Sequence, residues 1–495
     1  MATQIGALAK HTGWYGLGTM VGGVARAVMV PIIARYVPTA EYGKASVVLI
    51  LVTLLAIVSE LGLSSSLIKF VNEARTDEER KRAVSTILVG SLAIAVPLAI
   101  VAALCFVELS RLLLGSADYG TLILIGIIGG LGNAMLQVGL AFERAFAKSF
   151  RYFLYTLAKG VLSLVLSITL VVVLRRGAMG LLLGAALPPF LIGVGVYAGL
   201  FKRLGAAFSR ATLRSVFEFG GPLVPMNLAM WVLGSSDIYL LRRFAATPQA
   251  LSEVGLYQYA HEICLVLVLP VTALNLAWPQ FLFSNYMKPE GRDLFARVHS
   301  YFSFFLVEIA FLMAVFAGQI VRLVGTSGYA GSAGVIPMLA GSLLFYGFSI
   351  IFASGLYVTG RTRLLASIVG ACALLNVVLN ILLIPKLGKQ GAAFATMITN
   401  LVMMLTVLAF AQARFRIPFR IRPAYAGIVL AGGLVAGLAL LSRSHPALAG
   451  FLPRLATSCG FSVALFAILG MRPRDAAAIV RTLASVARPE PPPGG

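Results

Sequence analysis

The sequence predicts an all-α integral membrane protein, and composition, run length and run spacing carry this prediction. Of its 495 residues, 59% are hydrophobic and only 12% are charged, and the mean hydropathy is +0.93. This composition leaves too little polar surface for a soluble protein. The apolar runs are about 20 residues or longer, which suits helices that cross a hydrocarbon core about 30 Å thick. A membrane β-barrel would instead show short alternating segments.

A hydropathy window of about 19 residues predicts about fourteen transmembrane helices. They fall near residues 12–36, 44–71, 84–108, 119–142, 152–174, 178–201, 215–242, 253–282, 299–323, 332–357, 364–384, 391–412, 423–442 and 451–471. The N-terminus is too polar and too short to be a cleaved signal peptide, so the first run is expected to remain in the mature protein.

The formal charge of +22 could indicate a nucleic-acid surface, but the placement of Lys and Arg favours a different interpretation. Most of these residues fall in the loops that share a side with both termini, such as Arg80-Lys81-Arg82. The positive-inside rule then places both termini in the cytoplasm. The charge is mostly a topology signal, and nucleic acid is not an expected partner.

Three pairs of features recur at nearly the same spacing. Glu41-Tyr42-Gly43 matches Glu253-Val254-Gly255 and Arg151 matches Arg363, each 212 residues apart, and the segment 177–180 matches 388–391, 211 residues apart. The spacing indicates two halves of six helices each. Because six is even, both halves enter the membrane from the same side, an arrangement in which a substrate site lies between two rocking halves.

The predicted organisation is an N-lobe over residues 1–210 (helices 1–6), a C-lobe over 211–415 (helices 7–12), helices 13 and 14 within 416–471, and a cytoplasmic tail over 472–495. The tail has apolar residues at helical spacing followed by a proline-rich end, which predicts an amphipathic helix and then disorder. The four cysteines form no CxxC pair, so no disulfide framework or metal site is predicted. Because no P-loop motif occurs, energy is expected to come from an ion gradient, the substrate gradient or a partner.

Two basic residues fall inside predicted helices. Arg26 lies near the middle of the first helix, about 15 Å from its cytoplasmic start, which is too deep for its charge to reach the interface. It is either an anion anchor in a cavity or the partner of an acid such as Glu60. Lys159 lies in the cytoplasmic third of helix 5, so it either binds substrate or extends to the interface.

Asp237 lies in the helix 7 run, close to the position that the repeat spacing pairs with Arg26. The two opposite charges would then face one another across a central cleft and close a gate by ion pairing. The alternative for Asp237 is an ion pair with Arg242 or Arg243 at the end of its own helix.

Further acids lie deep in predicted helices, Glu60 in helix 2 and Glu262 in helix 8. An ionisable group in the hydrocarbon core costs roughly 2.5–3.5 kcal/mol, so these acids indicate a wet, protein-lined interior. We expect Glu60, Glu262 and Asp237 to serve coupling or gating, because burial and neighbours can tune an acid for proton transfer. Structural hydrogen-bonded pairs are the alternative. Tyr259 shares a helix face with Glu262, whereas His261 is expected to point elsewhere.

These motifs resemble those of a known family. The run from Phe219-Gly220-Gly221-Pro222 through Asp237 to Val254-Gly255-Leu256-Tyr257, together with Glu41-Tyr42-Gly43, resembles the Wzx-type oligosaccharide flippases of O-antigen and capsule synthesis. That family belongs to the multidrug/oligosaccharidyl-lipid/polysaccharide exporter superfamily. The resemblance extends to about residue 412. It implies two six-helix lobes around a V-shaped cavity.

The resemblance also implies a function. Such a protein moves an undecaprenyl-diphosphate-linked oligosaccharide from the cytoplasmic to the outer leaflet by alternating access, coupled to Na⁺ or H⁺. The implied substrate-binding residues are Arg26, Lys159, Asp237, Tyr257 and Tyr259, with charge-assisted hydrogen bonds from the two cations to the diphosphate. The implied location is the bacterial inner membrane, and the implied partners are membrane lipids and polysaccharide polymerase or assembly proteins. No cofactor, metal or enzymatic activity is expected.

Three alternatives remain open at this point. Helices 13 and 14 are similar to those that form a lipid-tail groove in lipid II flippases, so a lipid II flippase of peptidoglycan synthesis is the first. A cation-coupled multidrug exporter is the second, although such exporters carry acids in the first helix, where this chain has Arg26. A non-transporting scaffold of a glycan-assembly complex is the third, although a scaffold has no need of buried charges.

Overall fold

The computed structural model describes residue 18 and residues 21–470, except residues 206, 246, 248 and 446–449, and every regular element in these ranges is helical. A first helix covers residues 21–36. The longer helices that follow are α2 (Thr39–Glu60), α3 (Leu63–Glu73), α4 (Asp77–Leu104), α5 (Phe106–Leu114), α6 (Gly120–Ala145), α7 (Ser149–Ile168), α8 (Gly177–Leu204), α9 (Arg210–Gly220), α10 (Val224–Phe244), α11 (Ala250–Ile263), α12 (Leu265–Asn285), α13 (Gly291–Val315), α14 (Ala317–Val324), α15 (Ile336–Phe352), α16 (Ser354–Val358), α17 (Thr362–Gln412), α18 (Ile421–Ser444) and α19 (Phe451–Ile468). Short segments are η1 (Ala117–Tyr119), η2 (Thr169–Val173), η3 (Gly221–Leu223) and η4 (Ser327–Ser332). The predicted all-α class is confirmed, and the predicted tail lies outside the described residues.

Eleven of the described helices are long and apolar enough to cross a membrane, and α11 with the start of α12, bent by 56°, makes a twelfth. The 51-residue α17 contains the non-helical residue Gly388, which divides it into two helices. Unbroken, it would be about 75 Å long at 1.5 Å per residue, far more than one crossing requires. The count of about fourteen stays a prediction, because the start of the first helix lies outside the described residues.

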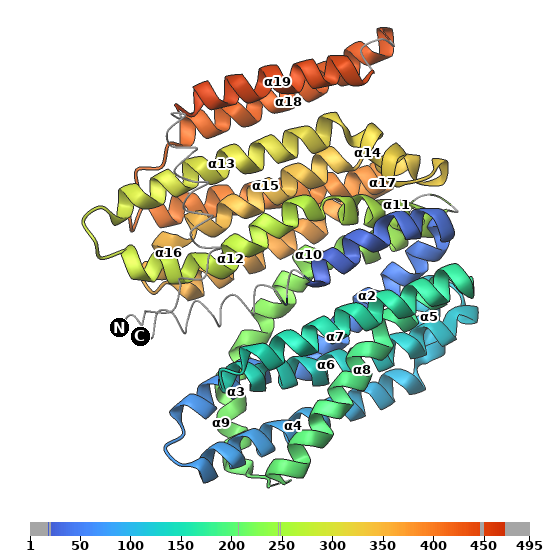
Figure 1. Cartoon of the computed structure of the whole chain (residues 1–495), viewed down its shortest axis with the longest axis vertical. Helices are drawn as coiled ribbons and strands as arrows, with labels where there is room; N and C mark the ends of the chain where they lie inside the picture. The colour runs from blue at the N-terminus through green and yellow to red at the C-terminus, as the bar shows by residue number, and fades with distance from the viewer. Residues whose placement is uncertain are drawn as a thin grey trace, which may run out of the picture.

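The helices form two bundles with a third, smaller unit beside them (Figure 1). In the first lobe, α6 packs against α2, α3, α4 and α8. In the second lobe, α15 packs against α13 and α17, and α10 packs against α17. Helices α18 and α19 pack beside α13. Helix α9 lies within the predicted C-lobe range but packs against α3 and α4, so the boundary at residue 211 stays a prediction.

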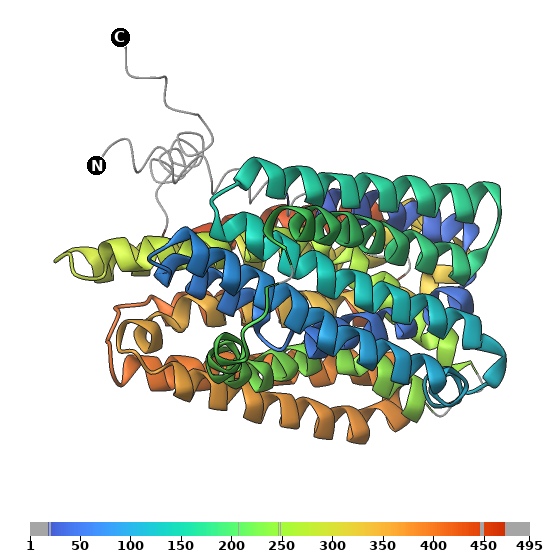
Figure 2. The same cartoon turned by 90° about the horizontal axis from the view of Figure 1, so that it is seen from below.

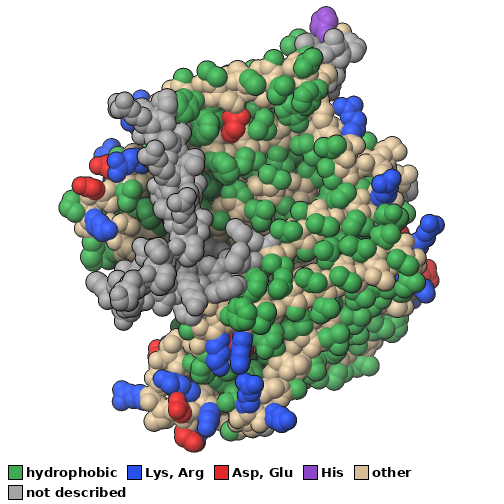
Figure 3. All heavy atoms as spheres, in the orientation of Figure 1, with side chains coloured by type: hydrophobic (Ala, Val, Ile, Leu, Met, Phe, Trp, Pro, Cys, Tyr) green, Lys and Arg blue, Asp and Glu red, His purple; other side chains and the backbone are tan. Residues whose placement is uncertain are grey.

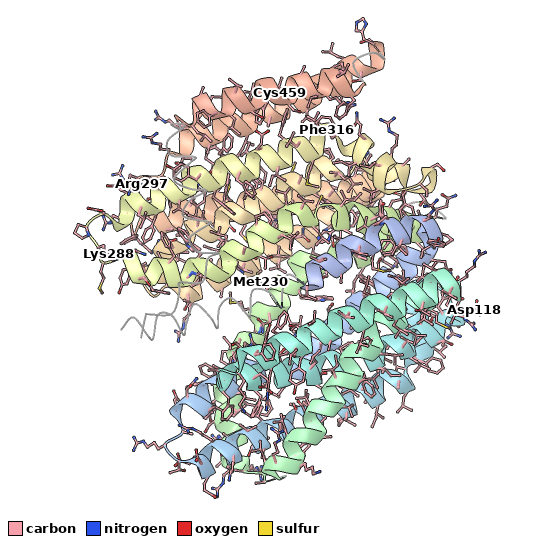
Figure 4. All side chains as sticks on the ribbon, in the orientation of Figure 1. Asp118, Met230, Lys288, Arg297, Phe316 and Cys459 are labelled. Atoms are coloured by element: carbon pink, nitrogen blue, oxygen red, sulfur yellow. The ribbon has the colours of Figure 1, made fainter. Side chains whose placement is uncertain are left out.

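The long helices run side by side along one direction (Figure 2). Hydrophobic side chains cover the middle of the face in Figure 3, and Lys and Arg gather toward its two ends. Lys288 and Arg297 lie at one end and Asp118 at the other (Figure 4). These ends are called the Lys288 end and the Asp118 end below. This apolar belt between two polar ends is the surface expected of a multi-pass protein, because the belt faces the hydrocarbon core and the ends face water.

The break between α2 and α3 packs against the break between α9 and α10. The chain turns at Leu61 and Gly62, with φ of 43° and 75°, and the Gly220–Gly221 break separates α9 from α10. A Cβ on Gly62 would lie 2.4 Å from the carbonyl oxygen of Gly220, so only glycine fits there. The Ser66 hydroxyl donates to the Val216 carbonyl at 3.1 Å. The glycine-rich start of the predicted helix 7 is therefore held against the first lobe.

Candidate functional site

A cavity of ≈ 680 Å³ lies between the two lobes. The first lobe contributes residues from the first helix and from α2, α6, α7 and α8, and the second lobe contributes residues from α10 and α11. On α2, the lining residues Ser46 to Thr53 are well inside the predicted membrane span. A cavity of this size is within the range of about 300–1,000 Å³ seen for ligand sites.

The first-lobe wall carries two cations. Arg26 and Lys159 both line the cavity, and the Lys159 Nζ donates to Asn133 Oδ1 at 3.2 Å. The two side chains are close enough for their like charges to repel one another. No acid in the described part of the chain lies within ion-pairing distance of either cation, so the alternative of an Arg26–Glu60 ion pair does not apply in this conformation. Within the described residues, this wall therefore carries two cations without an acidic partner.

The second-lobe wall carries Asp237, which is only 5% exposed and lines the same cavity. Its carboxylate accepts hydrogen bonds from the Tyr257 hydroxyl and, at 3.5 Å, from the Thr396 hydroxyl. The alternative of an ion pair with Arg242 or Arg243 is not seen among the described residues, and the Arg242 guanidinium instead donates to the Leu114 carbonyl at 3.0 Å. Asp237 and Arg26 therefore line one cavity from opposite lobes without an ion pair.

Helix α11 presents a polar face to the cavity through Gln258, His261 and Glu262. Positions i, i+3 and i+4 share a helix face, and these three residues have that spacing. The structure differs from the expectation for His261, which lines the cavity, and for Tyr259, which does not. Tyr259 is fully buried and its ring lies 4.4 Å from the ring of Tyr329 in η4, because this side of α11 packs into the second lobe.

Glu60 lines neither this cavity nor the smaller one described next. It is the last residue of α2, before the turn at Leu61 and Gly62, and lies near Tyr197. A role for Glu60 in coupling stays a prediction.

A second cavity of ≈ 210 Å³ extends into the second lobe. It shares Gly234, Asp237, Tyr257 and His261 with the larger cavity, and Met230, labelled in Figure 4, is on its wall. Its remaining lining consists of apolar side chains and an equal number of side chains with hydroxyl or amide groups. Asp237 therefore stands where the two spaces meet.

The lobes are in close contact at the Asp118 end, where α2 packs against α11. A Cβ on Gly43 would lie 1.8 Å from the Leu251 carbonyl oxygen, and a Cβ on Gly255 would lie 2.0 Å from the Thr39 carbonyl oxygen. The neighbouring Lys44 lies over the Tyr119 ring, which places this contact beside Asp118. The two glycines are the equivalent positions of the predicted repeat.

A second symmetric pair supports the repeat. The Glu41 carboxylate accepts from the Ala178 backbone N–H at 3.2 Å, and the Glu253 carboxylate accepts from the Lys389 backbone N–H at 3.4 Å. Each acid also has a lysine partner, Lys44 at 2.6 Å and Lys389 at 2.8 Å respectively. Each therefore ties the start of one helix to the start of another within its own lobe, at the lobe contact.

Further hydrogen bonds join the lobes at the Asp118 end. The Tyr329 hydroxyl donates to the Val37 carbonyl at 2.8 Å, and the Thr326 hydroxyl donates to the Ala34 carbonyl at 3.0 Å. The cavity thus lies on the Lys288 side of a closed contact. Within the described ranges, no group of three or more His, Cys, Asp or Glu side chains could hold a metal ion.

Comparisons with known proteins agree with this architecture. Residues 8–278, more than half of the chain, match the family model described as polysaccharide biosynthesis protein. An uncharacterized membrane protein of Methanocaldococcus jannaschii is 27% identical over 215 residues, which are 42% of this chain. The match covers 41% of that curated relative, so the chain spans about two fifths of its length.

Solved structures show the same fold at low sequence identity. The lipid II flippase MurJ in an inward closed conformation has a TM-score of 0.70 at 15% identity and covers 94% of this chain and 98% of its own. An inward-facing multidrug resistance MATE family transporter of the MOP superfamily has a TM-score of 0.62 at 16% identity, covering 79% of this chain and 98% of its own. A MOP superfamily transporter from Pyrococcus furiosus has a TM-score of 0.53 at 16% identity, with 82% and 95% covered. The chain therefore belongs to the polysaccharide biosynthesis protein family and has the fold of MOP superfamily transporters.

Proposed function

We propose that this protein is a flippase that moves an undecaprenyl-diphosphate-linked oligosaccharide from the cytoplasmic to the outer leaflet by alternating access. The observation that carries the proposal is the pair of cations, Arg26 and Lys159, on the wall of a cavity between two lobes at membrane depth. A diphosphate offers several anionic oxygens, and charge-assisted hydrogen bonds to them are among the strongest in proteins. The same wall has no acid in the described residues to neutralise it in the empty state.

The lobe contact suggests how the cavity changes sides. At the Asp118 end, Gly43 and Gly255 let α2 and α11 meet through their backbones. Rocking of the lobes about the cavity would separate these helices and open a path to the outer leaflet. In this proposal the Lys288 end faces the cytoplasm of the bacterial inner membrane, as the positive-inside rule predicts for both termini.

Coupling to Na⁺ or H⁺ is assigned in this proposal to Asp237. Its carboxylate is buried between the two cavities and is held by Tyr257 and Thr396, both of which donate hydroxyl hydrogen bonds. A cation or proton bound there would change the charge opposite Arg26. The occupancy of the second lobe would then affect the affinity of the first-lobe wall for an anion, which is the energetic link that coupling requires.

Two other transport functions are compatible with the fold. A lipid II flippase is favoured by the similarity to MurJ and by α18 and α19, which pack beside α13. A multidrug exporter is disfavoured because the first predicted helix, residues 12–36, contains Arg26 and no acid. Organic cations would meet two like charges on the first-lobe wall.

Deletion of the gene tests the proposal. We expect an undecaprenyl-diphosphate-linked oligosaccharide to accumulate on the cytoplasmic leaflet, with loss of a surface polysaccharide. Complementation with Arg26→Gln should leave the intermediate in place, Arg26→Lys should partly restore transport, and Glu108→Gln, at an exposed acid away from the cavity, should restore it fully. Accumulation of peptidoglycan precursor would assign the lipid II substrate instead. Unchanged lipid-linked intermediates of both kinds would refute a flippase role.

A further inference from the structure

The charges of the cavity are divided between its two walls. Arg26 and Lys159 stand on the first-lobe wall, and Asp237 and Glu262 stand on the second-lobe wall. No Lys, Arg or His of the described residues lies within 4.0 Å of either acid's carboxylate oxygens. A ligand that fills the cavity therefore meets positive charge on one side and negative charge on the other.

Glu262 lacks one of the partners that a carboxylate needs. Its Oε1 accepts from the Gln258 amide at 3.0 Å, but its Oε2 is buried without a hydrogen-bond partner. The neighbouring His261 also has a buried ring nitrogen, Nδ1, without one. A buried polar atom without a partner carries a free-energy cost, because it has given up its hydrogen bonds to water. A donor from a bound ligand or from water would remove that cost.

The polar face of α11 lies across the cavity from the cations. Gln258, His261 and Glu262 all line it, and the volume of ≈ 680 Å³ leaves room beside an anionic headgroup. Accepting the proposed function, the diphosphate occupies the cation wall, and the sugar attached to it extends toward this face.

The geometry points to Glu262 as the residue that selects the first sugar of the lipid-linked glycan. A sugar with hydroxyl, amide or ammonium donors can satisfy the free oxygen of Glu262. A sugar with its own carboxylate is rejected, because its charge would be brought next to the like charge of Glu262. Glu262 thus sets specificity by repelling acidic sugars as well as by binding neutral ones.

The test measures binding of three lipids to the purified protein in nanodiscs. All three carry the same polyprenyl diphosphate, which bears no sugar, a single N-acetylhexosamine or a single hexuronic acid. The wild type should bind the N-acetylhexosamine lipid at least about tenfold more tightly than the uronic acid lipid. In Glu262→Gln this ratio should fall to about threefold or less, while the sugar-free lipid should still bind.

Two further variants complete the design. Glu262→Asp retains the charge and should retain the discrimination, and Glu108→Gln, which removes an exposed acid elsewhere, should do the same. Retained binding of the sugar-free lipid shows that each variant is folded. If the wild type binds the sugar-free lipid but does not discriminate, or if Glu262→Gln discriminates as well as the wild type, the assignment of Glu262 is overturned and the flippase proposal stands. If the wild type does not bind the sugar-free lipid, the proposed function fails, and the assignment that rests on it falls with it.

Discussion

Replacement of Gly43 by alanine should prevent the lobes from closing at the Asp118 end. The added Cβ would lie 1.8 Å from the Leu251 carbonyl oxygen, whereas ordinary van der Waals contact begins at 3.4 Å. A flexible side chain could rotate away, but a backbone carbonyl inside α11 cannot. The two helices must therefore separate, which opens the contact that closes the cavity on this side.

The size of the effect follows from the cost of overpacking. Extra methyl groups in well-packed cores cost about 1–3 kcal/mol, and a clash with backbone is at the upper end of such costs. Since every 1.4 kcal/mol is tenfold, the closed population should fall about ten- to hundredfold relative to the open one. Transport should fall with it, because alternating access requires both states.

Pulsed electron paramagnetic resonance can measure the lobe separation. Spin labels at Asp118→Cys in the first lobe and Leu323→Cys in the second would report on the Asp118 end, since both positions are exposed. The exposed native cysteines, Cys105 and Cys459, should first be replaced by serine. In Gly43→Ala the short-distance population should be lost.

A matched glycine provides the control. Gly195 lies in α8, and a Cβ there would have no atom within 4 Å, so Gly195→Ala should keep the wild-type distances and transport. Gly255→Ala should behave like Gly43→Ala, because its Cβ would lie 2.0 Å from the Thr39 carbonyl oxygen. A Gly43→Ala protein with wild-type distances and full transport would refute the reasoning.

Three further predictions concern the lobes and the cation wall. Glu41→Gln and Glu253→Gln each remove a part-buried ion pair and weaken the hydrogen bond to a backbone N–H, so each should lower the thermal unfolding midpoint. Tyr329→Phe loses the hydrogen bond to the Val37 carbonyl between the lobes and should weaken closure by about 0.5–1.5 kcal/mol, seen as a smaller short-distance population for the same spin labels. Lys159→Gln should weaken binding of a polyprenyl diphosphate about tenfold or more and reduce the salt dependence of binding. Lys159→Arg should restore part of the affinity and part of the salt dependence. Equal binding by the two variants would show that the lysine does not contact the anion.

The charged residues of the cavity could be predicted because an ionisable side chain in an apolar run is visible in the sequence itself. Arg26, Lys159, Asp237, Glu262 and Glu60 are all predicted in this way. The structure brings the first four to one cavity, whereas Glu60 does not line it. The energetic penalty for charge in hydrocarbon makes each of them an exception that needs a wet or protein-lined surrounding.

The direction of each side chain was harder to predict. Tyr259 and Glu262 are three residues apart, which allows them to share a face, but the face of α11 toward the cavity is centred on Gln258, His261 and Glu262. Which part of a helix faces the cavity depends on how the helix packs, and the contact of Tyr259 with Tyr329 in a distant segment decides it here. The spacing of 258, 261 and 262 was the available signal.

The repeat spacing predicts only part of the lobe contact. The sequence spacing relates Gly43 to Gly255, but it does not show that these two residues meet. Residues related by a two-fold axis contact one another only where they lie close to that axis, and the position of the axis depends on the packing of all the helices. The close approach of the two backbones requires a glycine from each half, and each half supplies one at the equivalent position.

The two lobes are alike where they touch and unlike where they face the cavity. At the Asp118 end, each half supplies the same glycine and the same glutamate contact to a backbone N–H. In the cavity, Arg26 of the first half is matched by the region of Gly234 and Asp237 in the second, so a cation is replaced by an acid. Because these contacts are equivalent in the two halves, both lobes lose the same kind of contact when they move apart. Opposite walls give a dipolar ligand a single preferred orientation, because reversal would place its anion against Asp237 and Glu262. A lipid-linked glycan has an anionic end and a largely uncharged, donor-rich end, and a cavity with this division of charge would hold it in the same orientation before and after the lobes rock.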